Sequence, residues 1–337
     1  MSGSTISLPR LPSYIAEAFQ LPTELNPHQS EVEQASYAWF DSYEIYVDEK
    51  RQRFFDCQFG LFAALCFPNA EAARFRNTLD FTLWFFSFQM MVDGDEFNGP
   101  EDMKAATDAI MRAVSDPNAP SSNFQPAALI QSCFERIKQD GAPQTIQRFV
   151  AGLDEYTHAC FQEKFNRSAI PALEECIERR RATSGMNLWT SVFQYTLGLD
   201  LPDKVLDHQS VSGLALAGSD LFNLTDDIYS SIRATRNAYP FNIVSVVMHH
   251  KNLDLNGSIN FLDRLIRDRL DKYQDSKARV PSFGPGLDEQ VAQYAQSIEH
   301  AIKGLSEWAF MTPVYFGDQT ESARDTGVVD LEKLAAV

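Results

Sequence analysis

An apolar, aromatic segment that ends in a group of acidic residues is the part of this sequence best suited to chemistry. Residues 81–99 have the sequence FTLWFFSFQMMVDGDEFNG, so a buried helix would run directly into Asp93, Asp95 and Glu96. Carboxylates at the end of a buried helix can hold a divalent cation at the mouth of an apolar pocket. One helical turn earlier, where further acids would complete such a site, the chain has Gln89. The segment therefore predicts a divalent-metal site that is either altered or damaged.

A second group of polar residues lies within 206–237, which has the sequence LDHQSVSGLALAGSDLFNLTDDIYSSIRATRN. Asp226 and Ser230 are four residues apart, so on a helix both project from one face. A carboxylate and a hydroxyl one turn apart suit Mg²⁺, which takes few protein ligands and completes its shell with phosphate oxygens or water. Ala234, one turn further along that face, offers no ligand, whereas Arg233 beside it could contact a phosphate. The same pattern is also compatible with an acidic helix face in contact with solvent.

Three arginines precede a pattern that ends a helix. Residues 178–185 have the sequence ERRRATSG, and the glycine would stop the helix. A helix that breaks inside a core exposes carbonyl and amide groups whose dipoles can act on a bound ion. The alternative is a solvated basic helix end with a glycine cap.

The composition limits what the protein can be. The chain has 337 residues, of which 44% are hydrophobic, and this suffices for one large core or two modest cores. Its net charge of −17 argues against nucleic-acid binding through a general basic surface. No apolar run reaches the ~18 residues of a transmembrane helix, and the N-terminus lacks a signal-peptide pattern, so we expect a cytoplasmic protein. The five cysteines, an odd number without CxxC spacing, indicate reduced thiols and neither a disulfide framework nor a zinc site.

Helical periodicity dominates the chain, with no convincing strand and no glycine-rich nucleotide-binding loop. Breaks fall at clusters of proline and glycine such as Gly99-Pro100. We therefore expect an all-α fold with a flexible segment over 1–21, one helical domain over 22–317 and a frayed tail over 318–337. The expected helices are 29–48, 53–66, 69–93, 101–116, 125–139, 143–166, 170–182, 186–196, 204–235, 240–249, 256–275 and 287–310.

Short motifs follow one another in a fixed order along the chain. They are Leu25-Asn26-Pro27-His28, Trp39-Phe40, Leu79-Asp80-Phe81, Trp84-Phe85-Phe86, Arg181-Ala182-Thr183-Ser184-Gly185, Gly198-Leu199-Asp200-Leu201-Pro202, Asp226-Asp227-Ile228-Tyr229-Ser230, Glu307-Trp308 and Tyr315-Phe316-Gly317. In order and spacing this set resembles class I terpene synthases of fungal type, the sesquiterpene cyclase family. The resemblance covers roughly 22–317 and implies a single-domain helical bundle around an apolar cavity.

The resemblance implies ionisation of a prenyl diphosphate. In that family, three Mg²⁺ ions and basic residues bind the diphosphate, and the allyl cation cyclises in an aromatic pocket before deprotonation or capture by water. Metal charge stabilises the leaving group, and a dry, shaped cavity steers the cation. Aromatic faces stabilise cations, and the chain contains 25 Phe, 11 Tyr and 4 Trp.

Three positions depart from the family pattern. The family's Asp-Asp-x-x-Asp motif falls on 89–93, so Gln89 replaces its first metal-binding acid. The second metal motif begins at Asp226 and ends at Ala234, so its last acid is absent. The family's late Arg-Tyr pair is Val314-Tyr315 here. Each loss would cost about a hundredfold in rate, and together they argue against efficient ordinary ionisation.

The resemblance also implies roles for the residues that match family motifs: Arg181 corresponds to the diphosphate-sensing arginine, Ser184 to the linker and Gly185 to the backbone effector. The sequence also allows another alignment of the acidic motif, in which Asp93, Asp95 and Glu96 form a displaced version of it. We expect Mg²⁺ as the cofactor, with fewer than three ions or with none required. The expected catalytic residues are Asp93, Arg181, Gly185 and Tyr315; the expected substrate contacts are Phe81, Phe85, Phe88, Gln89, Arg233 and Trp308; the expected metal ligands are Asp93, Asp226 and Ser230.

Three functions are compatible with the sequence. The first is a terpene cyclase of secondary metabolism, of the sesquiterpene type, that acts on a prenyl diphosphate with an atypical Mg²⁺ site. The second is a repurposed cyclase-fold enzyme that acts on a preformed terpenoid, for example by coupling it to a small amine or by acid-triggered rearrangement. The third is a non-catalytic terpenoid-binding protein. In each case the partner is a small isoprenoid, neither nucleic acid nor a membrane span is expected, and a monomer and a homodimer are both compatible.

Overall fold

Helices form nearly all of the regular structure of this chain. The computed structural model describes residues 5–116, 118–165, 169–234 and 242–336, apart from the side chains at 233, 234, 335 and 336. In this part of the chain the all-α prediction is confirmed. The elements are β1 (Thr5–Ser7), α1 (Leu11–Phe19), α2 (Gln29–Asp41), α3 (Asp48–Asp56), α4 (Phe59–Cys66), α5 (Ala72–Asp93), α6 (Pro100–Ser115), α7 (Gln125–Asp140), α8 (Pro143–Phe165), α9 (Leu173–Thr183), α10 (Met186–Leu197), α11 (Asp203–Leu206), α12 (Gln209–Ala234), α13 (Ile243–Lys251), α14 (Leu255–Ala278), α15 (Pro285–Trp308), η1 (Gly317–Gln319), α16 (Thr320–Thr326), β2 (Val328–Asp330) and η2 (Lys333–Ala336).

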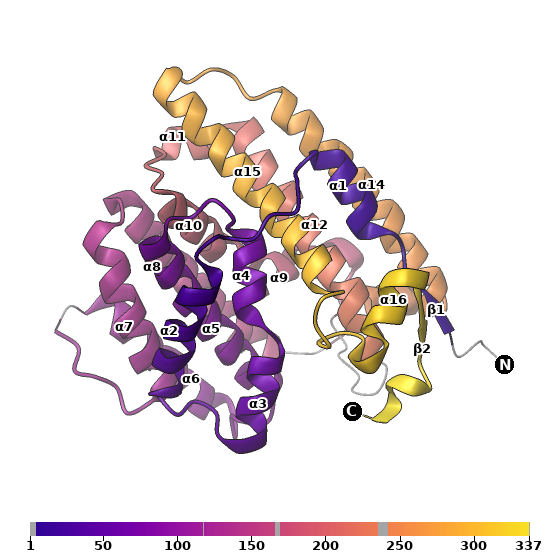
Figure 1. Ribbon diagram of the computed structural model, residues 1–337, viewed down its shortest axis with the longest axis horizontal. Coiled ribbons are helices and arrows are strands. Elements are labelled where there is room, and N and C mark those ends of the chain that lie inside the picture. The colour runs from indigo at the N-terminus through magenta and orange to yellow at the C-terminus, as the bar shows by residue number, and fades with distance from the viewer. Residues whose placement is uncertain (1–4, 117, 166–168, 235–241, 337) are drawn as a thin grey trace.

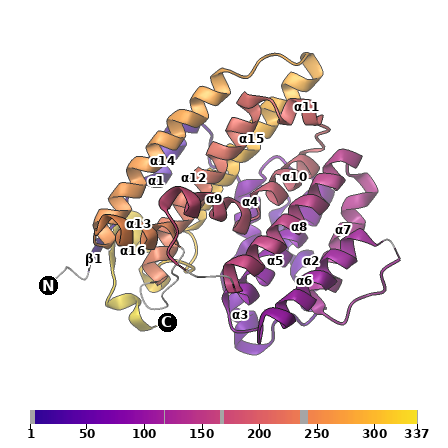
Figure 2. The ribbon, with the colours of Figure 1, turned by 180° about the vertical axis from the view of Figure 1, so that it is seen from behind.

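The helices are arranged in two groups that meet near the middle of the molecule (Figures 1 and 2). One group contains α2, α3, α5 to α8 and α10, and the other contains α12 to α16 with α1. The helices α4 and α9 lie between them. Because α15 packs against α4 and α12 packs against α9, the two groups meet through these two short helices.

Helix α5 is the central helix of the first group. Its residues Leu79, Phe81 and Trp84 are 0% exposed, and both faces of the helix are covered by neighbouring helices. The two ends of α5 reach the surface, with Ala72 and Ala73 exposed in its first turn and Met90 and Asp93 exposed in its last turn. The aromatic and acidic segment of the sequence therefore runs from the core to its rim.

The helix expected over 53–66 is interrupted in the structure. Gln58, between α3 and α4, has a left-handed φ of 53°. The carbonyl groups of Cys57 and Gln58 accept hydrogen bonds from Nε1 of Trp308, at 3.0 and 3.3 Å. Because these carbonyls find their donor on α15, far away in the sequence, helical periodicity could not predict the break.

The two ends of the chain pair with each other. Strands β1 and β2 are antiparallel, with Ile6 opposite Val329. Ile6, Leu11 and Ile15 are at most 2% exposed, so the N-terminal elements belong to the core. We expected a flexible segment over 1–21 and a frayed tail over 318–337, whereas the described residues of both form short strands and helices. Such pairing depends on contacts between distant segments, which short-range patterns do not reveal.

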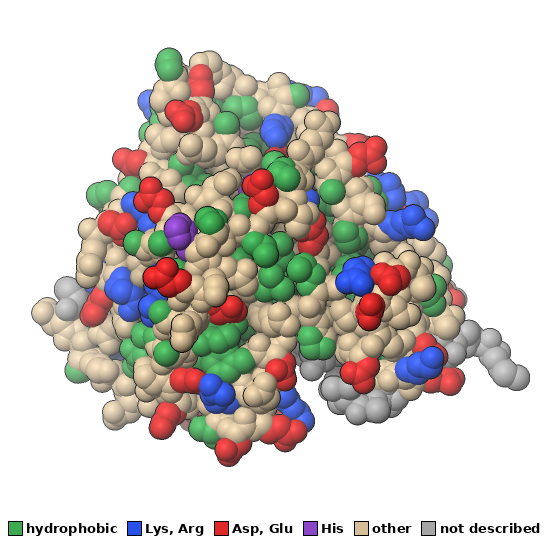
Figure 3. Space-filling view, viewed as in Figure 1, with side chains coloured by type: hydrophobic (Ala, Val, Ile, Leu, Met, Phe, Trp, Pro, Cys, Tyr) green, Lys and Arg blue, Asp and Glu red, His purple; other side chains and the backbone are tan. Residues whose placement is uncertain are grey.

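Acidic and basic side chains are scattered over the face shown in Figure 3, with apolar groups between them. In the described part of the chain, no helix is both long and apolar enough to cross a membrane. All five cysteines are buried, and none of them forms a disulfide.

Candidate active site

The junction between α9 and α10 fixes the backbone at the centre of the site. Gly185 joins the two helices with a left-handed φ of 65°. A Cβ atom at this position would lie 2.9 Å from the ring of Phe85 and 3.2 Å from the ring of Tyr156. The predicted helix break is therefore real, and glycine is required both by the backbone conformation and by the close approach of two rings. The carbonyl of Gly185 accepts the backbone N–H of Trp189 at 2.9 Å in the first turn of α10.

Arg180 connects α9 to the acids of α12. Its guanidinium donates to Oδ1 of Asp227 at 2.7 and 3.0 Å and to Oδ2 of Asp226 at 3.1 Å. Oδ2 of Asp227 accepts the backbone N–H of Ile243 at 2.6 Å. Burial raises the pKa of Asp227, and the guanidinium of Arg180 opposes that rise by stabilising the carboxylate.

Arg181 points to a different carboxylate from its neighbour. Its guanidinium donates to Asp220 at 2.7 and 2.9 Å, and Arg269 of α14 donates to the same carboxylate at 2.8 Å. The hydrogen bond to Asp220 raises the pKa of Arg181. We expected Arg181 as the diphosphate contact, yet in the structure Arg180 reaches the motif at Asp226.

The predicted metal ligands on α12 already have hydrogen-bond partners. The hydroxyl of Tyr315 donates to Oδ1 of Asp226 at 2.6 Å, so two expected site residues meet. Burial and the neighbouring Asp226 both raise the pKa of Tyr315. Oγ of Ser230 accepts a hydrogen bond from Nδ2 of Asn242 at 3.0 Å. The expected phosphate contact Arg233 has a side chain outside the described residues.

The acidic end of α5 is held by basic side chains. Nζ of Lys164 donates to the carbonyls of Val92 and Gly94 at 2.5 and 2.7 Å, which satisfies two groups at the end of the helix. Glu96 pairs with the exposed Lys50 at 2.9 Å. A small cavity of about 20 Å³ lies beside this end; its wall includes Gln89, Asp93, Glu163, Lys164 and Arg180.

The oxygen atoms of α12 that could bind a metal ion are few. Among the residues that the structure describes, no three His, Cys, Asp or Glu side chains lie close enough together to hold a metal ion. The carboxylate of Asp226 and the hydroxyl of Ser230 are oxygen donors on one helix face, which suits one Mg²⁺ completed by phosphate oxygens and water. To bind the ion, Asp226 must exchange Arg180 or Tyr315 for it. The oxygen donors of Asp226 and Ser230 therefore fit one Mg²⁺ ion held by α12.

An aromatic cavity lies between α4, α10 and α12. Its volume is about 20 Å³, far below the ~300 Å³ or more of ordinary small-molecule sites, so rings must move to admit a ligand. Ser184, at the helix break, forms part of its wall. Arg180, one helical turn earlier on α9, contacts Asp226 and Asp227, and these three residues are called the Arg180 cluster below. The lining residues are Phe62, Cys66, Phe67, Ser184, Met186, Trp189, Phe193, Phe222 and Ala301.

Three phenylalanines that were expected to contact substrate pack around the aromatic cavity without lining it. Phe81 packs on Trp189 at a centroid distance of 5.0 Å, and Phe85 packs on Tyr156 at 4.8 Å. Phe88 is 0% exposed. None of these three phenylalanines lines the aromatic cavity in the described part of the chain.

Phe86 of α5 packs against aromatic side chains of α4 and α15, one of which is Trp308, an expected substrate contact. Phe86 stacks on Phe59 at 4.2 Å and lies 6.4 Å from Trp308. Trp308 in turn lies 5.7 Å from Tyr315, so an aromatic wall leads to Asp226.

Four side chains at the site were not among the residues predicted from the sequence. Arg180 and Lys164 carry the positive charge beside the acids, and Trp189 and Phe193 line the aromatic cavity. The spacing of Trp189 and Phe193, one helical turn apart just after the break, is the signal that could have found the last two.

Comparison with known proteins identifies the family. Residues 80–272 match the family model described as "Terpene synthase family 2, C-terminal metal binding". The chain belongs to the terpene synthase family. Sesquiterpene synthase 3 of Postia placenta is 30% identical over 305 residues, which cover 90% of this chain and 83% of that protein. Sesquiterpene synthase Agr1 of Cyclocybe aegerita is 27% identical over 308 residues, which cover 91% and 88%.

Solved terpene synthase structures share the fold. Germacradien-4-ol synthase from Streptomyces citricolor superposes with a TM-score of 0.76 at 18% identity, covering 91% of this chain and 99% of that one. Wild-type cucumene synthase gives a TM-score of 0.75 at 18% identity, covering 87% and 99%. The family expectation and its helical fold are therefore confirmed.

Proposed function

We propose that this protein is a terpene cyclase-like lyase that ionises a prenyl diphosphate, with the C15 substrate farnesyl diphosphate as the best candidate. The observation that carries the proposal is an aromatic cavity whose wall reaches the helix break at Ser184-Gly185, next to the acids and arginines of α9 and α12. The relatives named sesquiterpene synthases support the C15 chain length.

The proposed roles follow from the contacts. Asp226 and Ser230 would hold one Mg²⁺, which when bound supplies the positive charge that stabilises a departing diphosphate. Arg180 and Lys164 border the small cavity at the acidic end of α5, so they would bind diphosphate oxygens by charge-assisted hydrogen bonds. Tyr315 would orient Asp226 through its 2.6 Å hydrogen bond. Rings at the aromatic cavity would stabilise the allyl cation through their faces.

The test is a substrate series with purified protein. Geranyl, farnesyl and geranylgeranyl diphosphate are incubated separately with Mg²⁺, and both released pyrophosphate and organic-extractable terpenes are measured. We expect both products from farnesyl diphosphate and their loss when EDTA is added. Absence of pyrophosphate release from all three substrates would reject the proposal.

A specific observation favours a second candidate function. Arg180 already forms ion pairs with Asp226 and Asp227, and Gln89 carries no charge, so a guanidinium lies beside the acids to which the family resemblance assigns a metal ion. This arrangement would suit an enzyme that acts on a preformed terpenoid, for example by joining it to a small amine. Conversion of a terpenoid that lacks diphosphate, undiminished by EDTA, would favour this candidate. Metal-independent binding of terpenoids without any conversion would indicate a binding protein.

A further inference from the structure

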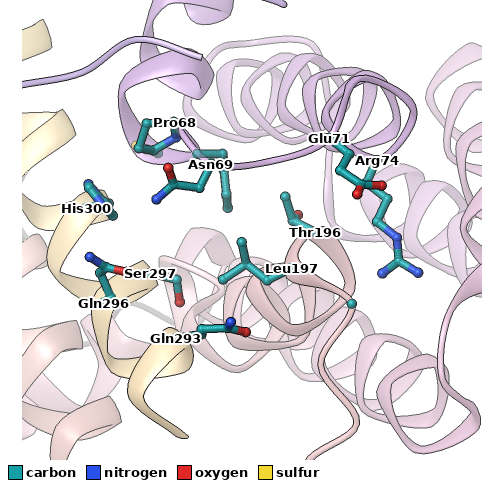
Figure 4. Close-up of a pocket in the computed structure, with 13 residues that line it drawn as sticks. Pro68, Asn69, Glu71, Arg74, Thr196, Leu197, Gln293, Gln296, Ser297 and His300 are labelled. Atoms are coloured by element: carbon teal, nitrogen blue, oxygen red, sulfur yellow. The ribbon is translucent and has the colours of Figure 1, made fainter. Parts of the chain in front are cut away.

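A second, larger cavity lies at the other end of α10. Its volume is about 510 Å³, and it opens to the surface between α15 and the start of α5. Figure 4 shows Gln293, Gln296, Ser297 and His300 projecting from α15, with Thr196 and Asn69 on the walls opposite. This polar cavity is large enough for ordered water, and its walls carry the amides and hydroxyls that hold water.

His300 is the least satisfied polar group of the polar cavity. The side chain is 6% exposed. Its Nε2 is buried from water and, within the described part of the chain, has no hydrogen-bond partner. Burial, with a smaller effect from Lys303, lowers the pKa of His300 to about 4. The imidazole is therefore neutral near pH 7 and keeps a free site for a proton.

Two residues form the partition between the polar cavity and the aromatic cavity. Cys66 and Phe67 line both of them, and Phe67 is 2% exposed. The carbonyl of Phe67 accepts a 2.7 Å hydrogen bond from Nδ2 of the buried Asn26, so the turn that carries the partition is fixed. The ring of Phe67 lies 5.7 Å from that of Phe193.

The polar cavity lies far from the acids. Along α10, Trp189 and Phe193 line the aromatic cavity, whereas Thr196 in the last turn lines the polar cavity. Along α5, the segment from Arg74 to Asp93 spans roughly 28 Å at ~1.5 Å per residue. Along the length of these helices, the acids come first, followed by the aromatic cavity, the partition and the polar cavity.

We propose that the polar cavity supplies the water that captures the final carbocation, and that His300 accepts the proton released, so that the product is a terpene alcohol. This inference rests on the proposed cyclase function. Water passes the partition at Phe67, its oxygen forms a C–O bond to the cation, and a protonated alcohol results. That species loses one proton through hydrogen-bonded water to His300, whose imidazole must turn so that Nε2, buried in the structure, faces the polar cavity. The imidazolium then returns the proton to solvent through the open side of the cavity.

The experiment measures the fraction of alcohol among the products of farnesyl diphosphate, together with pyrophosphate release. In H₂¹⁸O the wild-type alcohol should carry ¹⁸O. His300→Phe should lower the alcohol fraction by roughly tenfold or more, because the proton acceptor is lost. His300→Gln, which keeps an acceptor, should retain more alcohol than His300→Phe.

The partition is tested with a matched pair of variants. Phe67→Ala should raise the alcohol fraction, whereas Phe62→Ala removes the same ring from the aromatic cavity without touching the polar cavity. Equal alcohol fractions in these two folded variants would overturn the role of the partition. Pyrophosphate release with hydrocarbons alone would overturn the inference and leave the cyclase function intact. No pyrophosphate release would reject both.

Discussion

At the scale of single residues, Arg180 is the side chain that links the parts of the site. It lies on the wall of the small cavity beside Gln89 and Asp93, and it forms ion pairs with both Asp226 and Asp227. A buried carboxylate that loses its only nearby cation is costly, whereas an exposed pair contributes little. The neighbouring Arg179 forms an exposed pair with Glu175 and gives a matched control.

Arg180→Met should destabilise the protein by about 3–5 kcal/mol, because Asp227 stays buried without its counter-charge. Arg179→Met should change the unfolding free energy by at most about 1 kcal/mol. Urea denaturation of the two variants and the wild type measures both values. Equal losses of unfolding free energy in the two variants would show that the ion pair of Arg180 stabilises the fold no more than the exposed pair of Arg179.

His300 predicts a specific pH dependence of stability. Its pKa in the folded protein is about 4, against an ordinary value of 6.5. Between those values the folded form binds fewer protons than the unfolded form, so acidification favours unfolding. This contribution is fully present above about pH 6.5 and disappears as the pH falls to about 4, for a total of up to roughly 3 kcal/mol.

His300→Gln removes that titration. The variant should lose less stability than the wild type between pH 6.5 and 4, as measured by urea denaturation at several pH values. Parallel curves for the two proteins would contradict the lowered pKa of His300.

At the scale of elements, the junction of α9 and α10 depends on Gly185. Gly185→Ala forces a left-handed backbone on a residue with a Cβ, at about 1–2 kcal/mol, and adds a contact of 2.9 Å with Phe85. We expect a fall in both stability and turnover. Gly286→Ala in the first turn of α15, where a Cβ meets nothing within 4 Å, should be neutral or stabilising by up to about 1 kcal/mol. Thermal melts and pyrophosphate release from both variants test this contrast.

The elements were largely predictable, whereas their contacts were not. Pro100, Pro143 and Pro285 start helices where the sequence predicted breaks. The sequence could not tell which face of α5 meets the aromatic cavity, because apolar residues surround the helix and leave no polar face as a guide.

The sequence also could not show which of two neighbouring arginines contacts Asp227. Arg180 and Arg181 differ by about 100° around α9. Because of that rotation, Arg180 contacts Asp227 and Arg181 contacts Asp220. These pairings depend on how α12 packs against α9, which the sequence does not reveal.

At the scale of the whole molecule, the site lies where α9, between the two helix groups, contacts α12 of the second group through Arg180, Asp226 and Asp227. A ligand bound there should stabilise the folded chain as a unit. Mg²⁺ with inorganic pyrophosphate at a hundred times its Kd should raise the unfolding free energy by about 2.7 kcal/mol. The rise should be smaller in Asp226→Asn. Identical melting temperatures with and without the additives would argue against a diphosphate site.

The central claim is that α12 holds the metal on which diphosphate ionisation depends. The most direct measurement is the rate of pyrophosphate release from farnesyl diphosphate as a function of Mg²⁺ concentration. Wild-type protein should show Mg²⁺-dependent release, and Asp226→Asn should reduce the rate by roughly a hundredfold or more. Asp271→Asn, an exposed acid of α14, should keep the wild-type rate. Mg²⁺-independent release, or an unchanged rate in Asp226→Asn, would contradict the claim.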